Sequence, residues 1–460
     1  MTHRLNQRAS RLSSRLLPLA MAAALTLSAC TMPGDGDSSG VSASATPEWA
    51  HNATIYEVNV RQFSEEGTFD AFTRDIPRLK EMGVEILWLM PIHPIGELNR
   101  KGTLGSGYSV KDYVDVNPEF GTKEDFRELV AEAHRHDMKV LIDWVANHTA
   151  WDHGWTVSNP DFYNRGEEGE FLLPDPGWQD VIDLNFDNPE MREEMIQAME
   201  YWVREFDIDG YRCDVAWGVP NDFWAEANTR LDAIKPTFML GEADSPELHD
   251  AGFDMTYPWE YMHIQFHVAD GDSSIAAIDR YLQRQAEAFD PEDYRMFFTT
   301  NHDENTWKGS DPELYGDNFR AFAVLSATVH GMPLVYNGQE TGLDKRIEFF
   351  EKDAIVWDDY EHQDFYTSLL TLNQSNTALW NGEHGGPYEA LRVDEEANVY
   401  GYRRANDTDE VVVYLNFSGA PQTVEYAGDG TYTELFTGST YSSTITSTLP
   451  ANGYAVFVRD

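Results

Sequence analysis

The stretch Gly83-Val-Glu-Ile-Leu-Trp-Leu-Met-Pro91 carries an unbroken apolar run from Ile86 to Met90. A run this short and without alternation is typical of a β-strand that is buried on both faces, as in a parallel sheet. Comparable runs recur at 140–142, 238–240, 296–298 and 334–336. The repeated pattern therefore predicts a parallel sheet with a covering layer on both of its faces.

Helical periodicity separates these runs. Apolar residues share one helical face before Gly83, which reads as a stop signal: Phe69, Phe72, Ile76 and Leu79. A second helical pattern begins at Thr122, with Asp125 three residues on as in a capping box. Strands that alternate with helices over residues 49–378 predict an α/β fold, a (β/α)8 TIM barrel, in preference to an open sheet.

Two regions depart from this alternation. Residues 149–188, after the third strand, are rich in Gly, Pro and aromatic residues, and a loop this long predicts a small inserted subdomain. Residues 379–460 hold short β-branched and aromatic segments at 411–415, 432–436, 441–445 and 454–458. Gly, Asn and Ser separate these segments, so we expect a C-terminal antiparallel β-sandwich domain.

Residues 1–29 resemble a bacterial signal peptide. Arginines and no acidic residue precede an apolar stretch at 16–27, which ends at Leu27-Ser-Ala-Cys30. This ending resembles the lipoprotein box, in which the cysteine receives the lipid, and residues 30–48 then read as a flexible tether. We expect an exported protein, anchored to a membrane through lipid on Cys30 and facing the periplasm or cell surface. Plain secretion after signal-peptide cleavage is the alternative.

The composition is strongly acidic. The 460 residues include 33 Lys and Arg against 79 Asp and Glu, a formal net charge of −46. Nucleic acid is excluded as a partner, because phosphate binding needs a basic face. The acid excess indicates either general solubility or a salty habitat, and we favour the salty habitat. Cys30 and Cys213 are the two cysteines, so no internal disulfide is expected if Cys30 carries lipid. As a separate expectation, the protein is a monomer.

Carboxylates follow the predicted strands at the points where barrel enzymes place their chemistry. The four strand ends read Asp143-Trp-Val-Ala-Asn-His148, Gly210-Tyr-Arg-Cys-Asp214, Gly241-Glu242 and Asn301-His-Asp303. A single Asp at such a place is usually a cap or an ion-pair partner. Four carboxylates at the same end of the barrel repel one another and resist ionisation, so a fold would not collect them there without a function. The set therefore predicts a catalytic site.

These four segments resemble the signature regions of the α-amylase superfamily, glycoside hydrolase family 13. Further segments agree with the resemblance, which covers about residues 50–375: 83–91, 107–113, 183–185 and 331–338. The family implies a retaining mechanism with Asp214 as nucleophile, Glu242 as general acid and base, and Asp303 as stabiliser of the transition state. It implies no cofactor for this chemistry.

The resemblance also implies supporting roles. Arg212, two residues before Asp214 and on the same strand face, would keep the nucleophile ionised. His148 and His302 would hydrogen-bond the sugar next to the scissile bond, and Tyr108 would stack on its ring. Asp143 is similar to the family's structural aspartate beside that arginine.

A calcium site is the less specific implication. In relatives a calcium joins the third-strand loop to the barrel, and Asn147 and Asp183 stand at the matching positions. The segment Val215-Ala-Trp-Gly218 departs from the Lys-His of typical amylases and removes part of that site and one sugar contact. Asn147 is therefore either a calcium ligand or a structural hydrogen-bonding residue.

These residues favour an α-amylase that cleaves α-1,4 bonds in starch, maltooligosaccharides or related α-glucans. A cyclomaltodextrinase or oligo-α-glucosidase, or an α-glucanotransferase, is the alternative on the same barrel. A non-catalytic glucan-binding surface lipoprotein is the alternative of another class. Such a binder is expected to have lost the nucleophile or the acid, whereas this chain retains Asp214 and Glu242.

Overall fold

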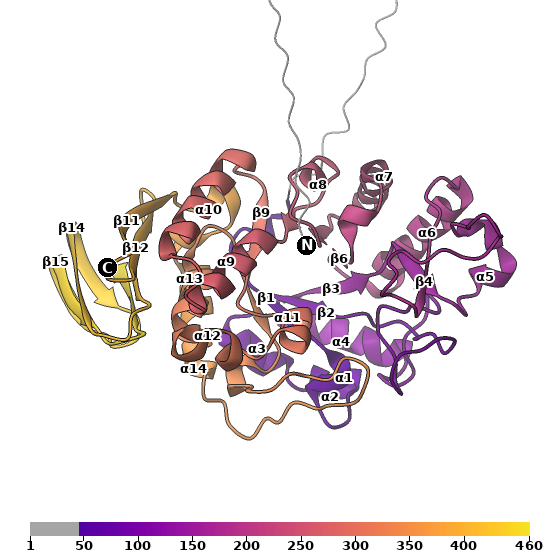
Figure 1. Cartoon of the computed structure of the whole chain (residues 1–460), viewed down its shortest axis with the longest axis horizontal. Helices are drawn as coiled ribbons and strands as arrows, with labels where there is room; N and C mark the ends of the chain where they lie inside the picture. The colour runs from indigo at the N-terminus through magenta and orange to yellow at the C-terminus, as the bar shows by residue number, and fades with distance from the viewer. Residues whose placement is uncertain (1–45) are drawn as a thin grey trace, which may run out of the picture. The chain divides into compact units, whose positions relative to one another are not determined.

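Residues 46–460 are described by the structure, a computed structural model, in which eight parallel strands close into a barrel (Figure 1). The strands follow one another around the barrel in the order β1-β10-β9-β8-β7-β6-β3-β2. Their bounds are β1 Ile55–Val58, β2 Ile86–Leu89, β3 Lys139–Trp144, β6 Gly210–Cys213, β7 Phe238–Gly241, β8 Met255–Thr256, β9 Tyr294–Phe297 and β10 Met332–Tyr336. The predicted barrel is confirmed, while the signal segment and Cys30 lie outside the described residues.

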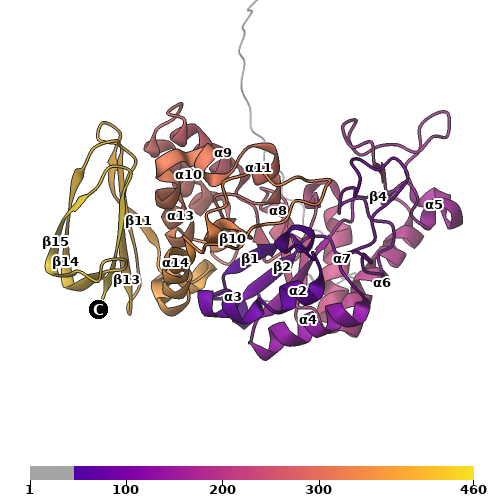
Figure 2. The same cartoon turned by 90° about the horizontal axis from the view of Figure 1, so that it is seen from below.

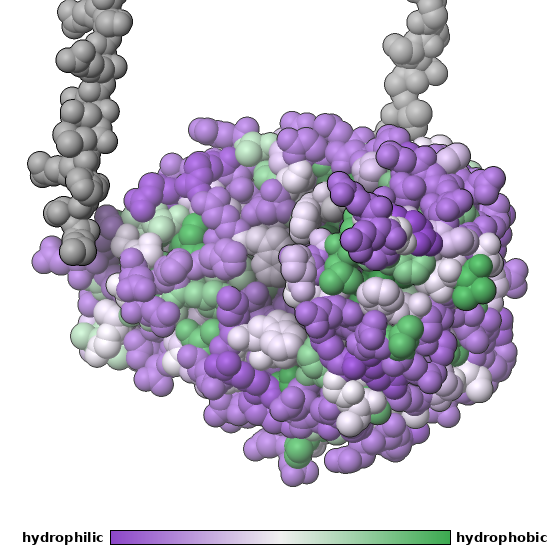
Figure 3. Space-filling model, turned by 45° about the vertical axis from the view of Figure 1, so that its right-hand side comes forward, coloured by the Kyte–Doolittle hydropathy of each residue, from purple (hydrophilic) through white to green (hydrophobic). Residues whose placement is uncertain are grey.

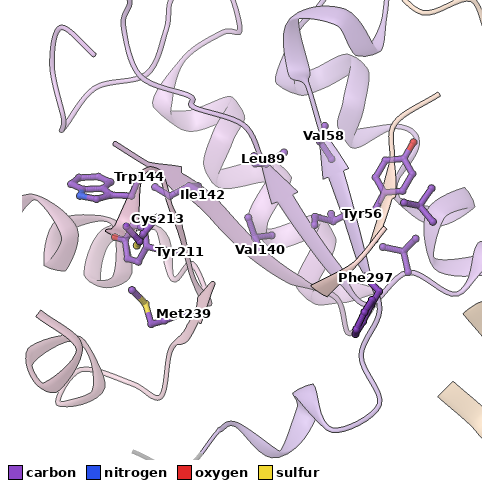
Figure 4. Close-up of a cluster of buried hydrophobic side chains, with 14 of the residues drawn as sticks. Tyr56, Val58, Leu89, Val140, Ile142, Trp144, Tyr211, Cys213, Met239 and Phe297 are labelled. Atoms are coloured by element: carbon purple, nitrogen blue, oxygen red, sulfur yellow. The ribbon is translucent and has the colours of Figure 1, made fainter. Parts of the chain in front are cut away.

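Both faces of these strands are buried, which explains the unalternated apolar runs. Side chains such as Ile55, Ile86 and Leu141 fill the barrel interior. The alternate side chains, among them Leu89 and Val140, pack between the strands and the surrounding helices (Figure 4). Toward the carboxyl ends of the strands the inward positions become polar, and this change places the site.

The helices surround the barrel and begin and end at recognisable signals. Thr122 and Asp125 form the predicted capping box of α4. Gly83 ends α3 at φ 96°, a left-handed conformation that favours glycine. The single pattern from Phe69 to Leu79 forms two helices, because Pro77 has no N–H for a continuous helix and instead sits in the first turn of α3.

The helix bounds are α1 Val60–Phe63, α2 Phe69–Thr73, α3 Ile76–Met82, α4 Lys123–Arg135, α5 Trp155–Ser158, α6 Pro189–Phe206, α7 Asn221–Asp232, α8 Glu247–Asp250, α9 Trp259–Ala269, α10 Ile275–Ala288, α11 His302–Trp307, α12 Asp311–Tyr315, α13 Phe319–Thr328 and α14 Gln363–Ser375. None of the helices in this part of the chain is both long and apolar enough to cross a bilayer.

The insertion after β3 contains a small antiparallel pair, β4 His148–Ala150 with β5 Val181–Asp183. This pairing sets His148 directly opposite Asp183. The long excursion therefore returns to the barrel rim beside the end of β3, where it can wall a site.

The C-terminal part forms one antiparallel sheet in the order β11-β12-β13-β16-β14-β15 (Figure 2). Its strands are β11 Tyr388–Asp394, β12 Val399–Ala405, β13 Glu410–Asn416, β14 Gln422–Glu434, β15 Thr440–Leu449 and β16 Tyr454–Arg459. The predicted antiparallel β domain is confirmed, with its six strands in one continuous sheet. The Phe417 ring packs 4.7 Å from Phe322 of α13, and the Tyr402 hydroxyl bonds Thr328 at 2.6 Å. The sheet thus covers barrel helices on the side away from the insertion.

Candidate active site

The predicted carboxylates meet at one end of the barrel. Asp214 directly follows β6, Glu242 directly follows β7, and Asp303 lies in the first turn of α11. The three side chains line a cavity of about 320 Å³. Its other lining residues are Lys101, Ser106, Tyr108, His148, Trp178, Asp180, Val181, Val215, Trp217, His302, Trp307, Phe349 and Phe350.

Arg212 joins the acidic residues on one side of this cavity. Its Nη1 lies 2.9 Å from Asp214 Oδ1 and 3.0 Å from Asp143 Oδ1, and its Nη2 lies 2.9 Å from Glu242 Oε2. Arg212 projects inward from β6 and is 1% exposed. One buried guanidinium therefore holds three carboxylates in a fixed arrangement, which a planar fork of donors does better than an ammonium group.

The environment of Asp214 sets its ionisation. Burial and the charge of Glu242 raise its pKa well above the usual range, and Arg212 acts against both. Asp143 shows the same balance, because burial raises its pKa while Arg212 lowers it. The cation therefore has to offset the cost of ionising two buried acids.

Asp143 supports the arrangement from below. In addition to Arg212, its Oδ2 accepts hydrogen bonds from Trp88 Nε1 at 3.1 Å and from the Tyr108 hydroxyl at 3.0 Å. Asp143 is completely buried. It orients Arg212 and Tyr108 and does not line the cavity itself.

Glu242 is oriented by the backbone after the strand that carries Asp214. The Val215 N–H donates to Glu242 Oε2 at 2.8 Å, and Val215 has φ 45°. A β-branched residue rarely adopts this left-handed conformation, and such strain collects at functional sites. Both polar contacts of Glu242 with the described residues use Oε2, which leaves Oε1 for a substrate.

His302 is the centre of a second group of contacts at the cavity. Its Nε2 is 2.8 Å from the Tyr108 hydroxyl and 3.3 Å from Asp303 Oδ2, and its ring stacks on Tyr108 with centroids 5.3 Å apart. Its Nδ1 bonds Glu57 Oε1 at 2.5 Å. Burial opposes protonation, but Asp303 and Glu57 outweigh it and raise the pKa of His302 to about 9.

His148 enters the cavity from the insertion. Its ring lies 5.7 Å from Trp178, and burial lowers its pKa to about 4, so it is neutral at physiological pH. Beside it, Lys101 and Asp180 form an ion pair at 2.8 Å. The neutral imidazole can exchange hydrogen bonds with an uncharged ligand such as a sugar.

Several cavity residues were not assigned to the site from the sequence. Exposed aromatic side chains surround the opening: Trp178 at 36%, Trp217 at 69% and Trp307 at 53% exposure. The ring of Phe349, from the loop after β10, lies 5.4 Å from that of Trp307 and is tilted against it. Two adjacent aromatic residues at 349–350, within an acidic loop, were a sequence signal for this part of the cavity. Glu57 does not line the cavity but bonds His302, and its charge inside an otherwise uncharged strand was a further signal.

The side chains of Asn147 and Asp183 both make hydrogen bonds to other side chains. The Asp183 Oδ2 accepts from Asn164 Nδ2 at 2.7 Å, and Asn147 Nδ2 contacts His148 Nδ1 at 3.2 Å. No group of three or more His, Cys, Asp or Glu side chains within residues 46–460 is arranged to hold a metal ion. Calcium prefers carboxylate and carbonyl oxygens, and the contact of Asn147 uses its Nδ2, so calcium binding by Asn147 and Asp183 stays a prediction.

Comparisons with known proteins place this chain in a family. A model described as α-amylase, catalytic domain, matches residues 34–168 and 166–390. A second, described as β-galactosidase C-terminal domain, matches residues 402–459.

Individual relatives agree with the family match. The chain is 30% identical to α-amylase MalA of Haloarcula japonica over 85% of its own length, and it spans 59% of that relative. It is 30% identical to an α-amylase from Lactobacillus plantarum of known structure, with a TM-score of 0.80, 90% of this chain and 100% of that chain covered. A maltogenic α-amylase from Thermotoga neapolitana gives 29% identity and a TM-score of 0.81, covering 89% and 99%.

Proposed function

Because the chain belongs to the α-amylase family of glycoside hydrolases, we propose that it is a retaining α-amylase. Its substrates would be α-1,4-glucosidic bonds in starch, maltooligosaccharides or related α-glucans. The observation that carries the proposal is the single guanidinium of Arg212, which holds Asp214 and Glu242 side by side at the cavity. A retaining glycosidase needs a nucleophile and an acid this close to one anomeric centre.

In the first half of the proposed reaction, Asp214 attacks the anomeric carbon. The bond from that carbon to the leaving oxygen breaks as the bond to Asp214 forms. Glu242 transfers its proton to the leaving oxygen through Oε1, the oxygen that the contacts described above leave available. In the second half, Glu242 takes a proton from water, the resulting hydroxide bonds to carbon, and Asp214 departs as a carboxylate.

The other side of the cavity binds the sugar that becomes attached to Asp214. Asp303 and His302 face this sugar, and the Tyr108 ring, already stacked on His302, offers it an apolar surface. Trp217, two residues after Val215, also lines the cavity, and we assign it to the leaving-group side. Its exposed indole provides a stacking surface for the sugar that departs.

A second candidate is an enzyme that trims short substrates, as a cyclomaltodextrinase, an oligo-α-glucosidase or an α-glucanotransferase does. The observation that favours it is the modest cavity of about 320 Å³ bordered by exposed indoles, which can hold a short oligosaccharide. Relative rates on starch, γ-cyclodextrin and maltotriose separate the candidates. Faster hydrolysis of cyclodextrin than of starch would favour the second.

The proposed function is tested by a time course of products from maltoheptaose, with and without a chelator. We expect internal cleavage, and NMR of the first product should show the α-anomer, because two displacements retain configuration. Early β-anomer would contradict the mechanism. The non-catalytic binder would be favoured if starch, maltoheptaose, cyclodextrin, pullulan and trehalose all yielded no reducing sugar. Loss of activity with the chelator would support the predicted calcium site.

We also propose export and lipid anchoring through Cys30, supported by the Leu27-Ser-Ala-Cys30 motif. Expressed in a bacterial host, the full chain should partition into the detergent phase of Triton X-114. Its Cys30→Ala variant should remain in the aqueous phase. A wild-type chain in the aqueous phase would contradict the anchor and favour plain secretion.

The acidic surface supports a further proposal, adaptation to salt. Hydrophilic side chains dominate the face shown in Figure 3, and the formal charge of −46 makes self-repulsion large. Screening should relieve this repulsion, so the Tm is expected to rise between 0.1 and 2 M NaCl. An unchanged Tm across this range would leave the acidity as a solubility feature.

A further inference from the structure

Glu57 is a buried charge that the proposed reaction leaves unexplained. It is the charged residue of β1, whose sequence is Ile55-Tyr-Glu-Val58, and it is 0% exposed. Its Oε1 bonds His302 Nδ1 at 2.5 Å, while its Oε2 has no hydrogen-bond partner among residues 46–460. A half-satisfied carboxylate in a barrel interior destabilises the fold, so its presence calls for a function.

The protons around His302 can be counted. Nδ1 faces the acceptor Glu57, and Nε2 faces the Tyr108 hydroxyl and the acceptor Asp303. The single hydroxyl proton of Tyr108 also has an acceptor in Asp143 Oδ2 at 3.0 Å. A neutral ring with its proton on Nδ1 would draw the Tyr108 proton away from Asp143 and turn a lone pair toward Asp303. A ring protonated on both nitrogens satisfies every contact.

We propose that Glu57 is a positioning residue that holds His302 as an imidazolium, with its Nε2–H presented to Asp303 and to the bound sugar. This inference rests on the proposed function for its effect on turnover. The carboxylate fixes the ring through Nδ1 and supplies the negative charge that keeps the second proton in place. His302 then acts as a cationic hydrogen-bond donor beside the sugar that becomes attached to Asp214.

The charges facing His302 come from several elements. Glu57 on β1 and Asp303 on α11 favour the imidazolium, and Asp143 on β3 adds to them. Arg212 on β6 disfavours it, as does burial. The carboxylates prevail and raise the pKa of His302 to about 9. The group is therefore charged through neutral pH and loses its proton as the pH rises through about 9.

The test is Glu57→Gln, which keeps the shape and the acceptor oxygen but removes the charge. The measurement is kcat on maltoheptaose as a function of pH. The alkaline limb of this profile, where kcat falls as His302 loses its proton, should move from about pH 9 toward histidine's ordinary pKa by about one pH unit or more. At neutral pH kcat should fall by about tenfold or more while KM changes by less than about threefold. Glu57→Asp retains the charge, so its limb should stay closer to that of the wild type.

Glu340→Gln is the matched control. Glu340 is a fully buried carboxylate beyond β10, and it bonds Tyr56, the neighbour of Glu57, at 2.6 Å from the opposite face of β1. Its replacement should lower the Tm and leave the alkaline limb where the wild type has it. An unmoved limb in Glu57→Gln, or an equal shift in Glu340→Gln, would overturn the proposal.

A double-mutant cycle separates action through His302 from other effects. In a His302→Gln background, Glu57→Gln should cause no further loss of kcat, because the residue acts through the imidazole. Additive losses would contradict this. The pair is also measurable without turnover: NMR titration of the His302 imidazole, assigned with His302→Gln, should give a pKa near 9 that falls in Glu57→Gln. A wild-type enzyme inactive on all α-glucans would refute the function, whereas an unshifted titration would refute the pair.

Discussion

The two sides of the cavity hold their carboxylates with different cations. On the arginine side, Arg212 bridges Asp143, Asp214 and Glu242. On the histidine side, His302 lies between Glu57 and Asp303. A guanidinium keeps its charge at every pH at which the protein folds, whereas an imidazolium can lose its proton. The positive charge on the arginine side is thus permanent, whereas the positive charge on the histidine side is lost at alkaline pH.

This difference suits the chemistry proposed for each side. The nucleophile must be ionised whenever substrate arrives, and burial together with Glu242 acts against that by raising the pKa of Asp214. A permanent cation beside it is the direct remedy. The sugar-gripping side needs a directional donor more than a fixed charge, and His302 provides that donor.

The largest effect is expected from replacing the nucleophile Asp214 on the arginine side. Asp214→Asn keeps the size of the side chain but removes the nucleophile, so kcat should fall on the order of 10⁴-fold or more. Oligosaccharide binding, measured calorimetrically with maltoheptaose, should persist. Turnover within about tenfold of the wild type would refute the assignment of the nucleophile.

Arg212→Lys replaces the guanidinium that bridges the carboxylates on the same side. A lysine keeps the charge but cannot contact three carboxylates from one planar group, so kcat should fall about 10²- to 10³-fold. Stability should fall by about 3 kcal/mol in urea unfolding, because buried acids lose partners.

The matched control is Arg404→Lys in the C-terminal sheet, where Arg404 is 1% exposed and donates to backbone carbonyls at 2.9 Å. This change should lower stability and leave kcat unaltered. Equal losses of kcat in the two variants would mean that the effect of Arg212 is purely structural.

The pH profile of the wild type sharpens the comparison. As pH rises through about 9, His302 loses its proton and activity should fall about tenfold per unit, while the arginine side is unchanged. As pH falls, protonation of Asp214 should remove activity at a pH above the usual range for an aspartate, because its pKa is raised.

Stability follows the same titration of His302. Its pKa in the folded state is raised, so its contribution is fully present below about pH 6.5 and is lost as pH rises through about 9. The Tm should therefore decline across this alkaline range in the wild type. A Tm decline of the same size in His302→Gln would show that other groups cause it.

The sequence predicted the features that depend on local pattern. Strands buried on both faces read as apolar runs, and β10 with its run at 334–336 is one example. Asp214 and Glu242 could be found because they stand directly after such runs. The two-residue strand β8 carries too short a pattern to be recognised.

The remaining site residues depend on three-dimensional register. Glu57 and His302 are 245 positions apart in the sequence. They meet because β1 closes the barrel by pairing with β10. Phe349 and Trp307 come together from a loop and a short helix that share no periodicity. The loop after β10 has no repeating pattern, so its aromatic side chains could be assigned to the cavity only from the folded chain.

The smallest expected effect concerns a hydroxyl that contacts both sides. Tyr108 contacts His302 Nε2 and donates to Asp143 Oδ2. Tyr108→Phe keeps the ring for stacking and removes the link, so kcat/KM should fall by roughly tenfold, the effect of one hydrogen bond to a charged group. If the hydroxyl couples the sides, the alkaline limb should also shift. An unshifted limb with reduced kcat/KM would mean that the two sides act independently, each held by its own cation.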